Sequence, residues 1–133
     1  MPAIHPVALY CTAFLGLLLF GLGFAVSMTR FRVRVGLGMP EDPDAILSRL
    51  VRAHGNTAEF APFLAVLFLL LGARDPSTLA LWLMGLATLA RLLLVVSLLI
   101  APTLRAAHPL RFIGAASTYA FGAWLCVLLA LSV

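Results

Sequence analysis

The residues with chemical potential in this sequence concentrate in one stretch, RLVRAHGNTAEFAPF, at positions 49–63. If this stretch is helical, at about 100° per residue, then Arg52, Asn56 and Glu59 fall within about 60° of one another. One helix face then carries a cation, a neutral amide and a carboxylate. Arginine suits anions because its planar fork gives a carboxylate two parallel hydrogen bonds and its charge is not lost. This polar stripe of Arg52, Asn56 and Glu59 therefore predicts a site for a charged ligand.

The rest of the chain is typical of a membrane protein. Of its 133 residues, 63% are hydrophobic, and the mean hydropathy is +1.11, whereas soluble domains are roughly half apolar. A helix needs about 20 apolar residues to cross a hydrocarbon core of about 30 Å. Four such runs are present, at about 6–28, 50–71, 77–100 and 109–131. We expect one all-α domain, residues 1–133, built as a four-helix transmembrane bundle with the first run retained as a span.

Proline positions refine the expected helix ends. Asp42-Pro43 and Asp75-Pro76 resemble an N-cap residue followed by proline at the first helical position, which predicts helix starts at these two places. The prolines of the loop at 101–109 should end the third helix and open the fourth. Pro62 removes a backbone hydrogen bond inside the second helix, so we expect a bend just past Glu59.

The arginines are distributed unevenly between the two sides of such a bundle. One side carries seven of them and the other carries only Arg74. The seven are Arg30, Arg32, Arg34, Arg49, Arg52, Arg105 and Arg111. The positive-inside rule then predicts a multi-pass membrane protein with both termini on the non-cytoplasmic side. No exposed basic stripe with interleaved aromatic residues is present, so a nucleic-acid partner is not expected.

Charges within the spans suggest how the site could be built. Arg91 and Glu59 lie at similar depths in their runs, and an unpaired charge at mid-bilayer costs about 2.5–3.5 kcal/mol on insertion scales. One interpretation is a structural Glu59–Arg91 ion pair that fixes helix packing. The other is an anion site in which Arg49, Arg52, Arg91 and Arg111 converge around a single carboxylate.

Three other residues have mainly structural interpretations. His54 falls on the opposite face of the second helix from the stripe, so we interpret it as structural or interfacial. Cys11 and Cys126 are isolated within spans and lack the paired spacing of a metal or redox site. We therefore predict two buried thiols and no metal site.

The string R-L-V-R-A-H-G-N-T-A-E-F-A-P-F resembles the second-helix signature of the membrane-associated proteins in eicosanoid and glutathione metabolism, the MAPEG family. The similarity covers nearly the whole chain and is greatest to the short bacterial members, which indicates a bacterial inner membrane. It implies a homotrimer that binds glutathione as co-substrate between subunits near the cytoplasmic face. Apolar electrophiles or lipid hydroperoxides from the bilayer would be the second substrates, and surrounding lipids would be further partners.

The same resemblance assigns roles residue by residue. Arg111 matches the fourth-helix arginine that stabilises the thiolate and is therefore the catalytic candidate. The candidate glutathione-binding residues are Arg52, Asn56 and Glu59 on the second helix, Arg91 on the third, and one of Arg30 and Arg32, of which Arg32 is selected.

The chain departs from the family pattern at three positions. Gly55 stands where some members have arginine, and Phe112 and Ala115 stand where some have serine or tyrosine. Tyr119 could supply the missing hydroxyl, although it lies a turn deeper. The missing hydroxyls keep open a non-catalytic lipid- or partner-binding bundle as an alternative to a glutathione transferase or peroxidase. A small proton-coupled exporter that uses Glu59 is a further alternative, because such exporters also have four spans and an intramembrane glutamate.

Overall fold

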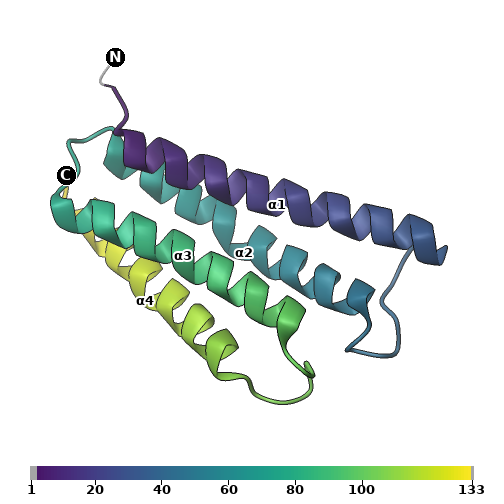
Figure 1. The fold of residues 1–133 in the computed structure, drawn as a ribbon. Helices are drawn as coiled ribbons and strands as arrows, with labels where there is room; N and C mark the ends of the chain where they lie inside the picture. The colour runs from purple at the N-terminus through teal and green to yellow at the C-terminus, as the bar shows by residue number, and fades with distance from the viewer. Residues whose placement is uncertain (1–2, 133) are drawn as a thin grey trace.

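The structure, a computed structural model, describes residues 3–132, and within them the chain forms four long α-helices (Figure 1). The helices are α1 (Pro6–Val33), α2 (Ile46–Gly72), α3 (Thr78–Ile100) and α4 (Pro109–Leu131). Each is long and apolar enough to cross a membrane. The predicted all-α transmembrane bundle is confirmed, and all four predicted runs lie within or next to these helices.

The predicted start of α2 was wrong. Asp42 accepts a hydrogen bond from the backbone N–H of Asp44 through its side-chain oxygen, at 3.0 Å. This closes a turn around Pro43 instead of starting a helix there, and α2 begins at Ile46. The aspartate therefore acts as a turn residue, a role in which its side chain competes with helix formation.

The predicted start of α3 was wrong for a similar reason. Asp75 has a left-handed backbone with φ of 51° and belongs to the α2–α3 turn. Ser77 is the N-cap instead, and its hydroxyl accepts a 3.2 Å hydrogen bond from the Ala80 amide. Serine caps as well as aspartate does, so the helix begins just after the proline. The predicted start of α4 at Pro109 is confirmed.

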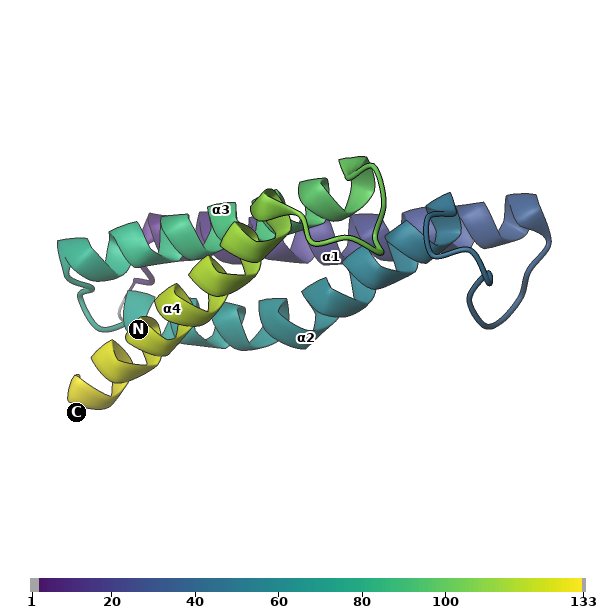
Figure 2. The same ribbon diagram turned by 90° about the horizontal axis from the view of Figure 1, so that it is seen from below.

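The helices pack unevenly around the bundle (Figures 1 and 2). α1 packs along α2 and also meets α3, while α4 packs along α3 and touches α2 only lightly. Within residues 3–132, α1 and α4 do not pack against each other. Figure 2 shows α2 changing direction near its middle, as expected for a helix that contains Pro62. The result is a loosely packed seam between α2 and α4.

Gly114 explains why α4 stays close to α3. A Cβ atom placed on Gly114 would lie 2.9 Å from the backbone nitrogen of Leu94. That distance is well below ordinary van der Waals contact, so a residue without a side chain is required. Small residues at helix crossings let transmembrane helices approach closely. Gly114 therefore sets the α3–α4 contact that leaves the other side of α4 facing the seam.

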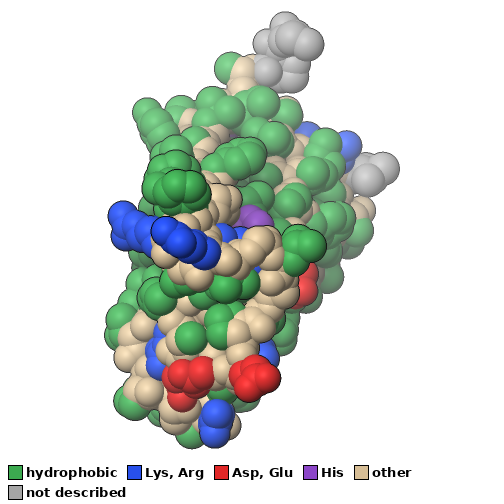
Figure 3. Space-filling model, turned by 90° about the vertical axis from the view of Figure 1, so that its right-hand side faces the viewer, with side chains coloured by type: hydrophobic (Ala, Val, Ile, Leu, Met, Phe, Trp, Pro, Cys, Tyr) green, Lys and Arg blue, Asp and Glu red, His purple; other side chains and the backbone are tan. Residues whose placement is uncertain are grey.

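The two ends of the bundle differ in charge. Both described chain ends lie at one end, together with the α2–α3 turn, whereas the α1–α2 and α3–α4 loops lie at the other (Figure 1). We call the second the arginine-rich end, and Figure 3 views it directly, with arginines among apolar side chains. Its arginines are the seven residues grouped above from the sequence, Arg30, Arg32, Arg34, Arg49, Arg52, Arg105 and Arg111.

Candidate functional site

A cleft of about 640 Å³ opens at the arginine-rich end, between α2, α3, α4 and the loops beside them. Four predicted site residues line it: Arg52, Asn56, Glu59 and Arg111. Its apolar lining includes Leu94, Leu98, Leu104 and Ala115. We call it the arginine cleft. It brings together two guanidinium groups, one amide and one carboxylate. Helical spacing predicted the grouping of Arg52, Asn56 and Glu59, and Arg111 joins them from α4.

Glu59 makes no ion pair and no hydrogen bond through its carboxylate within residues 3–132. The sequence interpretation of a structural Glu59–Arg91 pair is therefore contradicted. Glu59 is exposed on α2, because it faces the open seam and not α3. Its carboxylate is available to accept hydrogen bonds from a ligand.

Arg91 lies behind the wall of the cleft. Only 1% of it is exposed, and its Nη2 donates a 2.7 Å hydrogen bond to Oδ1 of Asn56. Its Cζ atom also lies 5.2 Å from the ring centroid of Phe60, a cation–π distance. Since Arg91 has only donors, it holds the oxygen of Asn56 toward itself. The amide nitrogen of Asn56 is then the group left to donate toward the cleft.

Arg111 reaches the cleft from the first turn of α4. Its Nη2 donates to the carbonyl of Ala106 at 2.6 Å, and its Nη1 donates to the carbonyl of Leu104 at 3.3 Å. The guanidinium is half-buried and is held against the α3–α4 loop. Two loop carbonyls therefore orient its cationic plane.

Arg49 does not join the cleft, contrary to the prediction that it would converge there. It is buried, and its Nη1 donates to the carbonyl of Ala101 at 2.6 Å, at the C-terminus of α3. Its Nη2 lies 3.5 Å from the Asp44 carboxylate, which is the single ion pair among the described residues. A cation at a helix C-terminus satisfies carbonyls that have no helical partner. Arg49 is a structural cap.

Arg32 is also outside the cleft of its own chain. It is exposed near the end of α1 and lines a separate surface hollow with Arg30 and Arg34. His54 lies on the α1 side of α2, where a Cβ on Gly23 would come within 3.2 Å of its Nε2. That position agrees with the interpretation of His54 as a packing residue.

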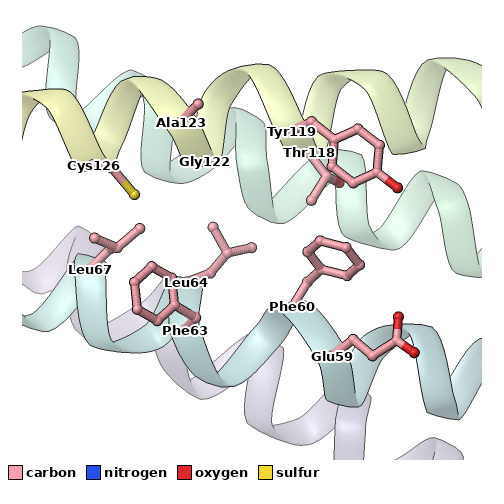
Figure 4. Close-up of a pocket in the computed structure, with 10 residues that line it drawn as sticks. All are labelled: Glu59, Phe60, Phe63, Leu64, Leu67, Thr118, Tyr119, Gly122, Ala123 and Cys126. Carbon is pink, nitrogen blue, oxygen red and sulfur yellow. The ribbon is translucent and has the colours of Figure 1, made fainter.

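An apolar groove of about 400 Å³ continues from the cleft along the α2–α4 seam (Figure 4). Its apolar lining includes Phe60, Phe63, Leu64, Leu67, Gly122 and Ala123. Glu59 lines both the groove and the arginine cleft. The ring of Tyr119 lies 5.5 Å from that of Phe60. The resemblance implied an apolar second substrate, but the residues that line this groove were not predicted. The small residues Gly122 and Ala123 on α4 were a usable signal.

Cys126 also lines this groove and is exposed, so the prediction that both thiols are buried was wrong for it. Its sulfur points into the groove in Figure 4. Cys11 is half-buried. Within residues 3–132, no group of three or more His, Cys, Asp or Glu side chains gathers with metal-site geometry.

The sequence did not identify Asp44 as a functional candidate. Its carboxylate accepts hydrogen bonds from the Thr103 hydroxyl at 2.7 Å and from the Leu104 amide at 2.6 Å. The hydrogen bond from Thr103, followed by that from Leu104, holds the pKa of Asp44 below its ordinary value of 3.8. Asp44 therefore stays ionised at neutral pH and joins the loop before α2 to the loop before α4.

Comparison with known proteins gives one finding that bears on this site. The family model described as "MAPEG family" matches residues 8–131 of the chain. That range includes all four helices almost completely and every residue of the arginine cleft. No curated protein matches the chain.

Proposed function

The chain belongs to the MAPEG family, and from this membership we propose that it binds glutathione in the arginine cleft. We further propose that it transfers the glutathione thiolate to apolar electrophiles held in the apolar groove, or reduces lipid hydroperoxides there. The observation that carries the proposal is that one carboxylate, Glu59, lines both the polar cleft and the apolar groove. A polar and an apolar substrate bound in these two places would meet at that point.

The polar groups of the cleft suit the charges of glutathione. The tripeptide has two carboxylates and one ammonium group, and Arg52 and Arg111 offer guanidinium groups for the carboxylates. Glu59 has a free carboxylate for the ammonium group, and the amide nitrogen of Asn56 is a further donor. A cleft of about 640 Å³ lies within the usual range for small-molecule sites, about 300–1,000 Å³.

Arg111 is the residue proposed to act on the thiol. A guanidinium next to a thiol favours its charged form and so lowers its pKa. The thiolate would then attack the electrophilic carbon, forming a C–S bond as the leaving group departs with its electron pair or as a proton adds to the product. With a hydroperoxide, the thiolate would attack the distal oxygen and break the O–O bond, giving glutathione sulfenic acid and an alkoxide that takes up a proton to leave as the alcohol. The thiol of a second glutathione would then attack the sulfenic sulfur, forming the disulfide and releasing water.

Arg32 requires a second subunit in this proposal. The MAPEG resemblance implies a homotrimer with the site between neighbours, so Arg32 of one chain would complete the cleft of another. This proposal is supported by the low burial of the most apolar windows of α1 and α4, only 17% in each. Mass measurement of the detergent complex tests it: three protomers are expected, and a monomer would contradict it.

We also propose that the arginine-rich end faces the cytoplasm of a bacterial inner membrane. The support is the uneven distribution of arginines between the two ends of the bundle. A reporter fused after α4 should be active when the reporter requires an extracytoplasmic location. Activity of a cytoplasmic reporter at the same position would reverse the orientation.

A non-catalytic lipid- or partner-binding bundle is the second candidate. The observation that favours it is the lack of a hydroxyl at Phe112 and Ala115, of which Ala115 lines the cleft. For the exporter alternative, a Glu59 without an ion-pair partner among the described residues is a favourable feature. Membership of the MAPEG family is now the argument against an exporter, and a proton-driven efflux assay tests it.

A calorimetric titration of the detergent-solubilised protein with glutathione tests binding. Arg52→Ala should weaken affinity by about tenfold or more, because it removes a charge-assisted hydrogen bond. Arg74→Ala is the matched control, since it removes an exposed arginine at the opposite end of the bundle. No binding by the wild-type protein, or an equal loss in both variants, would contradict the proposal.

A further inference from the structure

The two loops at the arginine-rich end are joined by Asp44. The Thr103 hydroxyl donates to Oδ2 of Asp44 at 2.7 Å, and the Leu104 amide donates to Oδ1 at 2.6 Å. Both donors belong to the α3–α4 loop, whereas Asp44 precedes α2. These are charge-assisted hydrogen bonds, which are about twice as strong as neutral ones. Asp44 thus fixes the α3–α4 loop to the start of α2.

Leu104 connects this junction to Arg111. Its N–H donates to Asp44, while its carbonyl accepts a 3.3 Å hydrogen bond from Nη1 of Arg111. Its side chain lines the arginine cleft, as Arg111 does. A shift of Leu104 would therefore move both a wall of the cleft and one of the two carbonyls that orient the guanidinium.

Arg49 holds Asp44 from the other side. Its Nε donates to the Asp44 carbonyl at 2.9 Å, and its Nη2 lies 3.5 Å from the Asp44 carboxylate. The same guanidinium caps the C-terminus of α3 through the carbonyl of Ala101. Asp44 is therefore fixed to α3 on one side and to the loop that carries Leu104 on the other.

We propose that Asp44 is a positioning residue for the anion site: it holds Leu104 and, through the Leu104 carbonyl, keeps the Arg111 guanidinium at the wall of the arginine cleft. This inference rests on the proposed binding of glutathione there. Asp44 does not line the cleft, so it acts through Arg111 and not on the ligand itself. Removing the charge of Asp44 should therefore weaken glutathione binding without removing any group that contacts glutathione.

The test compares variants that break the junction with variants that do not. Asp44→Asn removes the charge, and Thr103→Val removes the hydroxyl donor with little change of shape. Thr103→Ser restores that donor, and Glu41→Gln removes an exposed carboxylate from the same loop. Gly72→Ala provides a destabilised control at the opposite end, since a Cβ there would lie 2.5 Å from Cβ of Ala8.

Two readouts are measured at a temperature where every variant is folded. One is the glutathione affinity, together with the pKa of the bound thiol. The other is the rate at which phenylglyoxal modifies Arg111 in the unliganded protein, followed by mass spectrometry. We expect Asp44→Asn and Thr103→Val to weaken binding by about tenfold, to raise the thiol pKa toward its value in water and to speed modification of Arg111. Thr103→Ser, Glu41→Gln and Gly72→Ala should resemble the wild type in both readouts.

The inference is overturned if Asp44→Asn and Thr103→Val leave the modification rate of Arg111 unchanged, or if Gly72→Ala alters both readouts as much as they do. If Asp44→Asn does not fold, Thr103→Val decides alone. A wild-type protein that binds no glutathione would remove the proposed function. The modification rate of Arg111 would still show whether Asp44 positions it.

Discussion

Arg91 of α3 donates its 2.7 Å hydrogen bond to Asn56 of α2 and not to Glu59. Glu59 and Arg91 lie at similar depths in their spans, but they do not form an ion pair. Within the bundle, Arg91 contacts the neutral amide of Asn56 and the ring of Phe60, and its Nε is buried without a hydrogen-bond partner in the described part of the chain. Glu59 faces the open seam instead. This division leaves the cleft with a free carboxylate and an amide donor that is already oriented.

Asn56→Ala should destabilise the protein because it removes the hydrogen-bond acceptor of a guanidinium that is only 1% exposed. The expected loss is about 1.5–3 kcal/mol, the usual contribution of a hydrogen bond to a charged group. Thermal unfolding in detergent measures it. Arg52→Ala is the control on the same helix face, because Arg52 is exposed. Equal unfolding temperatures for the two variants would show that the bond does not contribute.

Glu59→Gln should leave stability nearly unchanged, since its carboxylate has no ion-pair partner among the described residues. Its affinity for glutathione should fall, because an ammonium group would lose a charged acceptor. Unfolding and calorimetric titration of the same preparation measure the two effects. A large loss of stability together with unchanged affinity would support the structural ion pair instead.

Gly114→Ala should destabilise the α3–α4 contact. The added Cβ would lie 2.9 Å from the backbone nitrogen of Leu94, and a backbone atom cannot move aside as a flexible side chain can. Overpacking of this kind costs about 1–3 kcal/mol. Gly85→Ala is the matched control, because nothing lies within 4 Å of its Cβ position and alanine is the better helix former. If both variants unfold alike, α3 and α4 are not in close contact at this point.

The contribution of Asp44 to stability should disappear in acid. Its pKa is lowered in the folded protein below the ordinary value of 3.8, mainly by the hydrogen bond from Thr103. A group with a lowered folded pKa stabilises the protein above its unfolded pKa, and this is lost as the pH falls through the folded value. The charged neighbours of Asp44 are Arg49 and Arg105, which both favour its ionised form.

The difference in unfolding temperature between wild type and Asp44→Asn measures this effect, because the two proteins differ only in the carboxylate of Asp44. It should be constant from pH 7 to about 5 and should shrink below 3.8. A difference that stays the same into strong acid would show that the Asp44 charge is not involved.

Much of the fold follows from hydropathy alone, because each span requires a long apolar run and four such runs are separated by polar segments. The α2 stripe was also predictable, since helical spacing fixes which side chains share a face. The helix starts after Asp42 and Asp75 were not, because a short polar side chain can form a turn as readily as a cap.

The side chains that contact each other between helices could not be predicted from their depth in the membrane spans alone. Arg49 and Arg52 are three residues apart, yet one caps α3 and the other lines the cleft. Glu59 and Asn56 are equally close in sequence, and only Asn56 turns toward Arg91. The rotation of each helix about its axis decides these pairs, and that rotation depends on contacts such as Gly114 against Leu94.

The ultraviolet absorbance of the glutathione thiolate, recorded on mixing glutathione with the protein in detergent, tests most directly whether the arginine cleft forms the thiolate. At neutral pH the wild-type protein should produce the thiolate band, because Arg111 and Arg52 line one cleft and favour the charged thiol. Arg111→Ala should abolish the band, whereas Arg74→Ala should retain it. A wild-type protein that gives no thiolate band, or an Arg111→Ala variant that keeps it in full, would contradict the proposal that Arg111 stabilises the glutathione thiolate.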